Sequence, residues 1–536
     1  MKKELLFISA ISIIVLMSVS SCRSNDTDQV LQTGGIASVK VNLTGTDYAG
    51  LKGAAQSSLK TEANSDVQSP QRQLKLVTPS SYIEAELSSV NTRVNSSQAS
   101  LKSNLLASAT GDPLGTGMKF RVIAYRQSNG SYQDHKDYTV GQPAEGLILD
   151  GGIAYDFVVY SYGASTLPVI TAGEMSDINS GVVSYSNTNP DFMYQKVSYT
   201  PTNPTNTLPI TLRHKLTRIT TTVTSIGNGD ITSITGGYIT PHYTNGSITL
   251  SSGVMTRTGS PSTVNLSFTP VDNVSMQSAP VLINADTSGA LTGSFSADMT
   301  VGGVSKTVSL SNSFKITPEY DSHLSINLRK CGAYTGPNTD PSNYKEFMCQ
   351  NLGATSGVDP FSPEAGNHGA KYEWGYKPAN PTVSDSRYYT QANDQANSGA
   401  ISGWNSTSLP NGSWSDTSKT ANDPCPSGYR VPTSAQWQAV IDNNNVERVG
   451  SWSDNGNYTT ALYFRSPSNQ RTLMLPAAGF RYSPDGGLGY RGVAGLYLSS
   501  SEATFSTASG LQFTSSGVAV DSLSRTAGIS VRCIAE

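Results

Sequence analysis

Hydrophobic and polar residues alternate along much of the first 330 residues, with the period of two that is typical of β-strands. Val39, Val41 and Leu43, for example, alternate with polar residues. Similar runs follow at 118–125 and 132–140, and they are joined by a Ser-Asn-Gly turn that is typical of a hairpin. Because such short strands recur with frequent turns and almost no helical periodicity, the pattern predicts β-sandwiches.

Residues 44–110 interrupt this pattern, because Ser, Gln, Asn and Lys dominate their composition. Only 73–77 and 82–87 have the alternation of strands. The sequence therefore predicts a long, accessible segment between the first strand and the hairpin that begins at residue 118.

A helical pattern is found near residue 433. Thr433 and Gln436 have the spacing of a capping box, and Trp437, Val440 and Ile441 follow at i, i+3 and i+4. These residues predict a short amphipathic helix that ends in the run of three asparagines after it.

The first residues have the features of an export signal. Met-Lys-Lys-Glu precedes an apolar run at 5–19, which is too short for a comfortable membrane span. The run ends in Val-Ser-Ser-Cys22, which resembles a bacterial lipobox, so we expect 1–21 to be a lipoprotein signal peptide and Cys22 to be lipidated. Residues 22–34 then form a polar tether similar to the surface-export signal of Bacteroidetes lipoproteins, which implies the outer face of an outer membrane. An ordinary secretory signal with an incidental cysteine is the alternative.

The composition is that of an extracellular β protein rather than of a cytosolic enzyme. Charged residues make up 14% of the chain, against about 25% in an average globular protein, and uncharged polar residues replace them. The net charge of −3 shows no basic excess. Nucleic acid is therefore excluded as an expected partner.

Four further cysteines lie in the last two fifths of the chain: Cys331, Cys349, Cys425 and Cys533. None forms a CxxC pair or has a histidine at zinc spacing, so disulfides are favoured over free thiols or a metal site. We expect Cys331 to pair with Cys349 and Cys425 with Cys533, although four cysteines allow three pairings. The second bridge would close a loop of about 110 residues, worth ~4–5 kcal/mol in the chain-entropy model. Disulfides also indicate an oxidising compartment.

Catalytic residues do not gather in any recognisable pattern. No nucleophile elbow, zinc-protease motif or phosphate loop is present, and the five histidines are scattered: His135, His214, His242, His323 and His368. We therefore expect no enzyme activity, no cofactor and no metal. The open alternative is a pair of sugar-cleaving carboxylates drawn from Asp416, Asp423 and Asp454, which are otherwise solvated loop residues.

All five tryptophans lie after residue 331. Trp437 is expected in the core, on the helix described above. Trp404 and Trp414 lie in the segment 377–422, whose Gly, Asn and Ser content predicts a long surface loop. They are candidate ligand-binding residues, because exposed indoles are enriched in binding sites. The alternative is that they are local packing anchors.

The C-terminal motifs carry a family resemblance. They are CGAY at 331–334, EFMCQNLG at 346–353, YEWG at 372–375, CPSGYRVPTSAQW at 425–437, AGFR at 478–481, GLYLSS at 495–500 and SVRCI at 530–534. In this order they resemble the Fibrobacter succinogenes major paralogous domain. The resemblance implies an α+β C-type-lectin-like domain over 331–536.

The first half resembles the fimbrillin (Mfa-like) pilus proteins of Bacteroidetes. The motifs are GMKFRVIAY at 117–125, LDGG at 149–152, DFMY at 191–194 and HKLTRITTTVT at 214–224. The resemblance implies two tandem transthyretin-like β-sandwiches, the first over 35–212 and the second over 213–330. The whole chain would then be mainly β.

In pili of this kind, the resemblance implies, a lipid-anchored precursor is trimmed by a protease after a basic residue. The first strand is lost, and a neighbouring subunit inserts a donor strand into the groove. Arg72 is the preferred processing site, with Lys60 and Arg93 as alternatives.

The expected function is therefore that of a fimbrial subunit. Because Cys533 would seal the terminal strand, we expect a tip adhesin whose last domain binds a glycan or host protein. Its other partners would be pilin subunits, and the outer membrane through the lipid anchor of the precursor, before the mature protein joins the fimbrium. The alternative is a non-polymerising surface glycan-binding lipoprotein.

Overall fold

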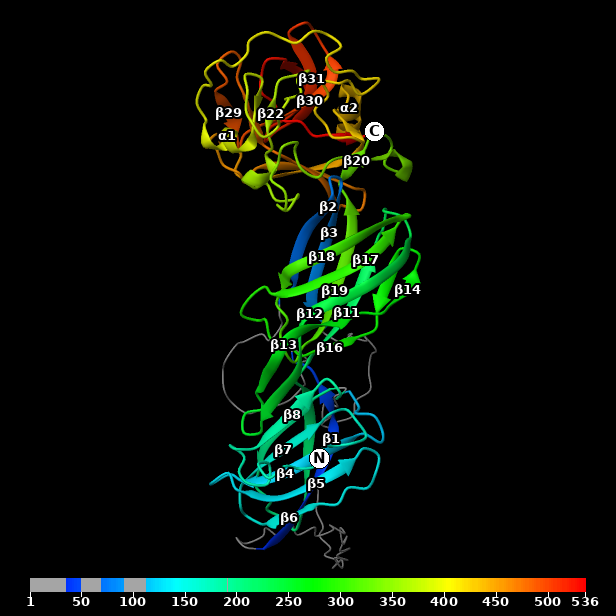
Figure 1. Ribbon diagram of the computed structural model, residues 1–536, viewed down its shortest axis with the longest axis vertical. Coiled ribbons are helices and arrows are strands. Elements are labelled where there is room, and N and C mark those ends of the chain that lie inside the picture. Colours follow the sequence, from blue (N-terminus) through cyan, green and yellow to red (C-terminus); the bar gives the residue numbers. More distant parts are fainter. Residues whose placement is uncertain (1–34, 50–68, 91–111, 190) are drawn as a thin grey trace, which may run out of the picture.

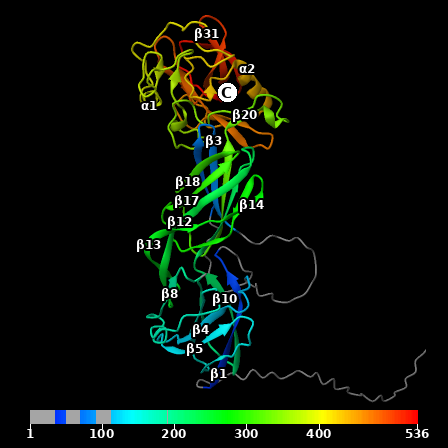
Figure 2. The ribbon, with the colours of Figure 1, turned by 45° about the vertical axis from the view of Figure 1, so that its right-hand side comes forward.

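The computed structural model describes residues 35–49, 69–90, 112–189 and 191–536. It is mainly β, as predicted. Figure 1 shows an elongated molecule with three bodies in line, and the turned view in Figure 2 shows the same order. We call them the first domain, the second domain and the head, which comprises residues 331–536. Among the described residues, no helix has both the length and the apolar character needed to cross a membrane.

The first domain is built on one seven-stranded sheet in the order β5-β4-β7-β9-β10-β1-β6. The two edge strands of this sheet are β5 and β6. Tyr138 of β5 and Leu147 of β6 belong to the same hydrophobic cluster, so the sheet curls around its core. Only β1 and β10 run parallel; the other pairs are antiparallel. The strands are β1 Ile36–Asp47, β4 Lys119–Arg126, β5 Tyr132–Thr139, β6 Leu147–Asp150, β7 Tyr155–Ser161, β9 Met193–Tyr199 and β10 Thr205–His214.

The second domain packs two sheets around one core, in which alternating residues of both sheets are buried. The first sheet contains β2 Gln71–Thr78, β3 Ser81–Ser89, β11 Thr217–Thr224, β14 Phe268–Asp272, β15 Ser275–Ser278, β16 Val281–Ile283 and β19 Asp321–Lys330. The second sheet contains β8 Val182–Ser186, β12 Ile231–Thr249, β13 Met255–Asn265, β17 Gly293–Val301 and β18 Val304–Phe314.

The β2–β3 hairpin belongs to the second domain, although it precedes most of the first domain in the chain. β3 pairs with β19 in antiparallel register, with Leu87 opposite Leu324, and places Ile83 and Ala85 in the core. The range 35–212 expected for the first sandwich is therefore corrected, because it contains strands of the second domain. Sequence alternation identifies a strand and its buried face, but the partner across the ladder is set by three-dimensional packing.

The head combines short strands with two helices, α1 Gln391–Ala396 and α2 Ser434–Asn443. In α2, Thr433 Oγ1 accepts from the Gln436 backbone N–H and Gln436 Oε1 accepts from that of Thr433, so the predicted capping box is confirmed. Helix α1 lies within 377–422, which the sequence predicts as loop. The strands of the head are β20 Gly332–Tyr334, β21 Tyr344–Glu346, β22 Lys371–Tyr372, β23 Tyr388–Tyr389, β24 Tyr429–Arg430, β25 Asn445–Val449, β26 Ala461–Arg465, β27 Arg471–Pro476, β28 Ala478–Arg481, β29 Leu488–Arg491, β30 Gly495–Glu502, β31 Thr507–Phe513, β32 Val518–Ser524 and β33 Ile534–Ala535.

Both disulfides have the expected pairing. Cys425 is bonded to Cys533 across 108 residues, and β24 pairs with β33 directly beside this bridge. Cys331 is bonded to Cys349 across 18 residues. The longer bridge ties the segment before α2 to the last strand of the head.

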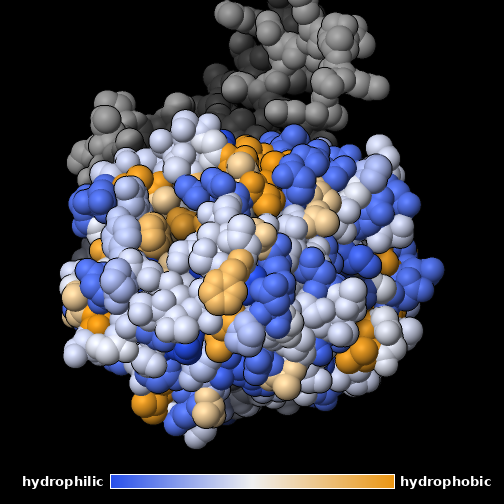
Figure 3. All heavy atoms as spheres, turned by 90° about the horizontal axis from the view of Figure 1, so that it is seen from above, coloured by the Kyte–Doolittle hydropathy of each residue, from blue (hydrophilic) through white to orange (hydrophobic). Residues whose placement is uncertain are grey.

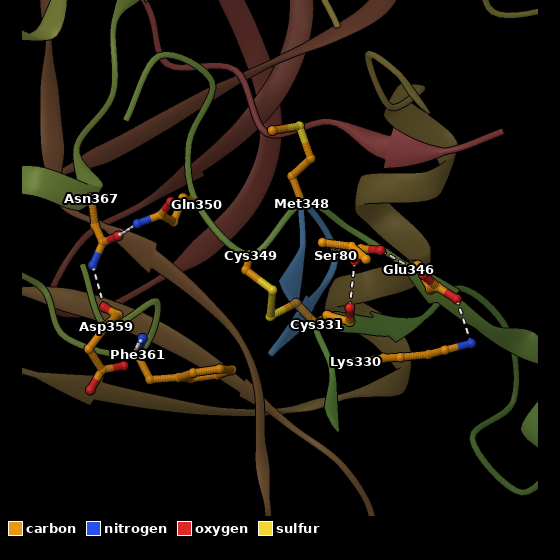
Figure 4. Close-up of a disulfide and its surroundings, with 12 residues drawn as sticks. Ser80, Lys330, Cys331, Glu346, Met348, Cys349, Gln350, Asp359, Phe361 and Asn367 are labelled. Atoms are coloured by element: carbon orange, nitrogen blue, oxygen red, sulfur yellow. Dashed lines mark hydrogen bonds and ion pairs between the residues drawn. A yellow bond between two sulfur atoms is a disulfide. The ribbon is translucent and has the colours of Figure 1, made fainter. Parts of the chain in front are cut away.

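The turn of the β2–β3 hairpin joins the second domain to the head (Figure 4). The backbone N–H groups of Cys331 and Cys349 donate to the carbonyls of Ser80 and Pro79, each at 2.7 Å. Ser80 Oγ donates to Glu346 Oε2 at 2.7 Å. The hairpin turn is thus bonded to both halves of the short disulfide, which fixes the head on the second domain.

Candidate functional site

β1 occupies an interior position in the curled sheet of the first domain. It pairs in parallel with β10 from Ser38 to Asp47, whereas it pairs with β6 only from Ile36 to Val39. Val39 and Val41 are buried in the core of the domain, as their alternation predicts. β1 is therefore the strand that completes this core.

A cavity of ≈ 280 Å³ lies beside β1 where β6 ends. Leu43 of β1, Phe120, Tyr138 and Leu114 are among the residues that line it. In the described part of the chain, the β6 side of β1 has no ladder partner from Lys40 until the isolated bridge between Thr46 and Asp112. The strand therefore lies in a slot that is open on one side and lined by both apolar and polar residues.

The far end of β1 is bound at the junction of the first two domains. Asp47 accepts two hydrogen bonds from Arg213, at 2.7 and 3.0 Å. The Tyr48 ring stacks on the His214 ring, with centroids 4.0 Å apart. The Arg218 guanidinium lies over the Tyr48 ring, 4.8 Å from its centroid. Burial raises the pKa of the Tyr48 hydroxyl, so the ring is neutral at physiological pH.

The chain leaves β1 at the junction and continues through 50–68 into β2, which belongs to the second domain. No other backbone connection joins β1 to the strands that follow. A cut between β1 and β2 would leave β1 held in the first domain by ladder hydrogen bonds, side-chain contacts and packing alone.

The predicted processing and lipidation residues are mostly outside the described residues: Cys22, Lys60 and Arg93. Arg72 lies in β2, opposite Glu86 in the ladder with β3, and its half-exposed side chain forms an ion pair with Glu84. A protease needs an extended chain whose backbone is free of ladder bonds, so Arg72 is a poor substrate in this fold. The preference for Arg72 is therefore corrected.

Trp404 and Trp414 are packing residues, which corrects their expected role as a ligand platform. Trp404 is 6% exposed, and its indole N–H donates to the Thr526 carbonyl at 2.9 Å. Trp414 is 1% exposed and packs against Trp374 with ring centroids 5.7 Å apart. Their partners are distant in sequence, so the absence of periodic apolar neighbours near each residue did not predict exposure.

The three candidate carboxylates do not form a pair. Asp416 accepts hydrogen bonds from Ser500 and Ser501, and buried Asp423 accepts from the backbone N–H groups of Cys425 and Val431. Asp454 is exposed in another loop. Within the described ranges, no cluster of His, Cys, Asp and Glu side chains has the geometry of a metal site.

Several ionisable groups inside the head have strongly shifted pKa values, which is a common feature of active sites. Burial lowers the pKa of Lys371 to about 8 and that of His368 to about 3, and it raises the pKa of Glu373 to about 8. All three side chains are at most 1% exposed. A substrate cannot reach them, so they are structural groups of the head interior.

Acid is expected to destabilise the head through His368. Its folded-state pKa lies below the unfolded value of 6.5, so the unfolded chain binds a proton that the folded chain excludes. The stabilising contribution is complete above pH 6.5 and is lost as pH falls toward 3, by about 2 kcal/mol at pH 5. His368→Gln should remove this loss, so between pH 7 and pH 5 its free energy of unfolding should rise by about 2 kcal/mol relative to that of the unsubstituted protein.

Glu373 acts with the opposite sign, so the difference between His368→Gln and the unsubstituted protein isolates the histidine. His135→Gln, in the first domain, is the matched control and should leave the pH dependence of the head unchanged. A His368→Gln protein with the original slope would contradict the prediction.

Comparisons with known proteins assign no family to the chain. No family model matches it, and no curated protein matches it. Solved structures with some similarity include a candidate cell adhesion protein from Bacteroides uniformis, which is 15% identical with a TM-score of 0.28 over 40% of this chain and 92% of its own. A candidate cell adhesion protein from Bacteroides fragilis is 12% identical with a TM-score of 0.28 over 54% of this chain and 91% of its own. A candidate polysaccharide-binding protein from Bacteroides thetaiotaomicron is 11% identical with a TM-score of 0.24 over 40% of this chain and 89% of its own.

Proposed function

We propose that the protein is a cell-surface fimbrial subunit of the fimbrillin (Mfa-like) type, whose head presents a binding surface for a glycan or host protein. The proposal includes transthyretin-like first and second domains, a C-type-lectin-like head, and a lipid-anchored precursor at the outer membrane. The observation that carries it is the placement of β1. This strand completes the core of the first domain, yet its only covalent link to later strands runs through 50–68.

This placement supports strand exchange as part of the proposal. After a cut between β1 and β2, a strand from another subunit could pair with β10 along the register that β1 now uses. It would need apolar side chains at the positions of Val39, Val41 and Leu43 to fill the same slot. The cavity beside Leu43 offers room where an incoming strand could first insert.

The last strand of the head supports a position at the fimbrial tip. Ile534 is fully buried, β33 pairs with β24, and Cys533 is bonded to Cys425. Residues 529–535 can therefore leave as a donor strand only if the head opens. A subunit of this kind accepts a strand but does not donate its β33.

A labelled peptide tests the proposal. A specific protease site is inserted between residues 50 and 68, and a fluorescent peptide of residues 36–47 is added before and after cleavage. The cleaved protein should bind the peptide in place of β1, and the uncleaved protein should not. A peptide with Val39→Asp and Val41→Asp is the matched control and should fail, because both positions are buried. If the cleaved protein never exchanges β1, strand exchange is excluded.

The alternative is a non-polymerising surface glycan-binding lipoprotein, in which the first two domains are spacers. The complete first domain favours it, because β1 leaves no empty position between β6 and β10. Mass spectrometry of the surface-exposed protein separates the two functions. A new N-terminus after Lys or Arg between 60 and 93 indicates the fimbrial subunit, and a lipidated Cys22 alone indicates the alternative.

A further inference from the structure

The outer face of the β28–β29 hairpin carries three aromatic rings in mutual contact. Phe480 and Tyr490 are stacked, with centroids 5.8 Å apart and an interplanar angle of 7°. Tyr482 packs edge-on against Phe480 at 4.8 Å and lies 6.4 Å from Tyr490. Tyr482 is 40% exposed and Tyr490 44% exposed, so two of the three rings face solvent. We call these three residues the aromatic platform.

The inner face of the same hairpin is held rigidly. Arg481 and Arg491 are buried beneath it, whereas Tyr482 and Tyr490 are exposed. Both arginines bond the buried carboxylate of Asp394 on α1, at 2.8 and 2.7 Å. Trp404 supports the hairpin loop, since its ring lies against Gly486. The platform is thus fixed before any ligand binds, which lowers the entropic cost of binding.

The backbone at Tyr490 is strained, and its carbonyl accepts hydrogen bonds from the backbone N–H groups of Val493 and Ala494. Its φ is 62°, in the left-handed region that bulky side chains avoid. The neighbouring Gly489 leaves space for the Tyr482 ring, which a Cβ would meet at 2.5 Å. Asparagine or glycine would fit position 490 with less strain. Strain of this kind is common at functional sites.

The surroundings of the platform are polar and acidic. Partial desolvation, the Tyr490 hydroxyl and the carboxylates of Asp454 and Asp485 raise the pKa of Tyr482, so its hydroxyl group is neutral. The charged groups that act on Tyr482 are these two carboxylates. They would accept hydrogen bonds from hydroxyl groups, and they would repel sulfate or carboxylate groups.

The end face of the head does not have the character of a large apolar protein interface. Its end face shows hydrophobic residues singly or in small groups among hydrophilic ones (Figure 3), and the platform hairpin lies on the flank beside α1 (Figure 1). A ligand for the platform needs a flat apolar face of the size of one or two rings and hydroxyl groups at its rim. A neutral sugar ring has both, with C–H groups on one face and hydroxyl groups around the edge.

From these observations we infer that the aromatic platform is a subsite for a neutral pyranose, which stacks on Tyr482 and Tyr490 and donates hydroxyl hydrogens to Asp454 and Asp485. This inference rests on the proposed binding role of the head. It places the ligand at the platform rather than at Trp404 and Trp414.

The test uses the full chain and an array of neutral oligosaccharides ending in β-galactose, β-glucose or α-mannose, with their sialylated and sulfated counterparts. Neutral probes should bind. The double variant Tyr482→Ser with Tyr490→Asn should raise the dissociation constant about tenfold or more, because it removes two stacking contacts with the sugar. The substitution at position 490 should not lower the melting temperature, because asparagine adopts the left-handed backbone conformation of that position with little strain. Tyr490→Phe, which keeps the ring, should still bind.

Phe505→Ser is the matched control, because Phe505 is 74% exposed but lies in the loop between β30 and β31. It should leave sugar binding unchanged. Three results would each overturn the inference. The protein could fail to bind every neutral probe at millimolar concentration, the double variant could bind as well as the unsubstituted protein, or the protein could prefer the sialylated or sulfated probes. If the double variant instead loses attachment to cells stripped of glycans, the ligand is a protein and the inference also fails. Exchange of β1 is measured separately, so either proposal can fail while the other stands.

Discussion

Asp394→Asn should lower the free energy of unfolding of the head by about 3–5 kcal/mol, because it removes the carboxylate that joins two buried arginines. Arg481 and Arg491 are 0% and 6% exposed, and each donates to one carboxylate oxygen and to the backbone carbonyl of Asp394. Asparagine has nearly the same size but carries no charge, and one of its terminal groups is a donor that faces a guanidinium. Calorimetry of the full chain should show the head transition at a clearly lower temperature.

Asp485→Asn is the matched control for this substitution. Asp485 lies in the turn of the same β28–β29 hairpin but is exposed, so the expected change is within about 0.5 kcal/mol. If Asp394→Asn and Asp485→Asn lower the free energy of unfolding by the same amount, the ion pairs of Asp394 with the two arginines do not stabilise the head as described. Sugar binding should also weaken in the Asp394 variant, because the platform then loses its rigid backing.

Removal of the long disulfide by Cys425→Ser with Cys533→Ser should cost about 4–5 kcal/mol in the chain-entropy model. The bridge closes 108 residues, which contain α2 and most strands of the head. Denaturant unfolding under non-reducing conditions measures the change.

The short bridge provides the comparison. Cys331→Ser with Cys349→Ser opens a loop of only 18 residues, for which the same model gives about 3 kcal/mol. An unchanged denaturation midpoint after loss of the Cys425–Cys533 bridge would contradict this account of the head. It would also weaken the argument that β33 is locked against donation.

The strands and the α2 helix could be predicted from the sequence because their signals are local. The alternation of Val39, Val41 and Leu43, and the capping box of Thr433 and Gln436, each depend on residues within a few positions of one another. The partner of β3 could not be predicted in this way. Its ladder with β19 joins residues more than 200 positions apart, and any strand with a matching apolar face would satisfy the same pattern.

The aromatic platform was not predicted, for a similar reason. The AGFR motif at 478–481 was used only as part of a family resemblance, whereas its alternation of Phe480 with Arg481 already separates an outer aromatic face from an inner charged one. Tyr482 and Tyr490 flank a Gly-rich turn, which is the local signal that could have indicated a hairpin with three aromatic residues. Composition instead drew attention to Trp404 and Trp414, whose buried partners lie far along the chain.

The hairpin turn beneath the head has a mechanical consequence for any force applied to the head. β19 runs directly into the head at Lys330, and β3 lies beside it along the long axis with its turn bonded at the Cys331–Cys349 bridge. Tension on the head therefore loads the β3–β19 ladder in shear, so that many hydrogen bonds must break together rather than one after another. The second domain is built to transmit a pull without stretching.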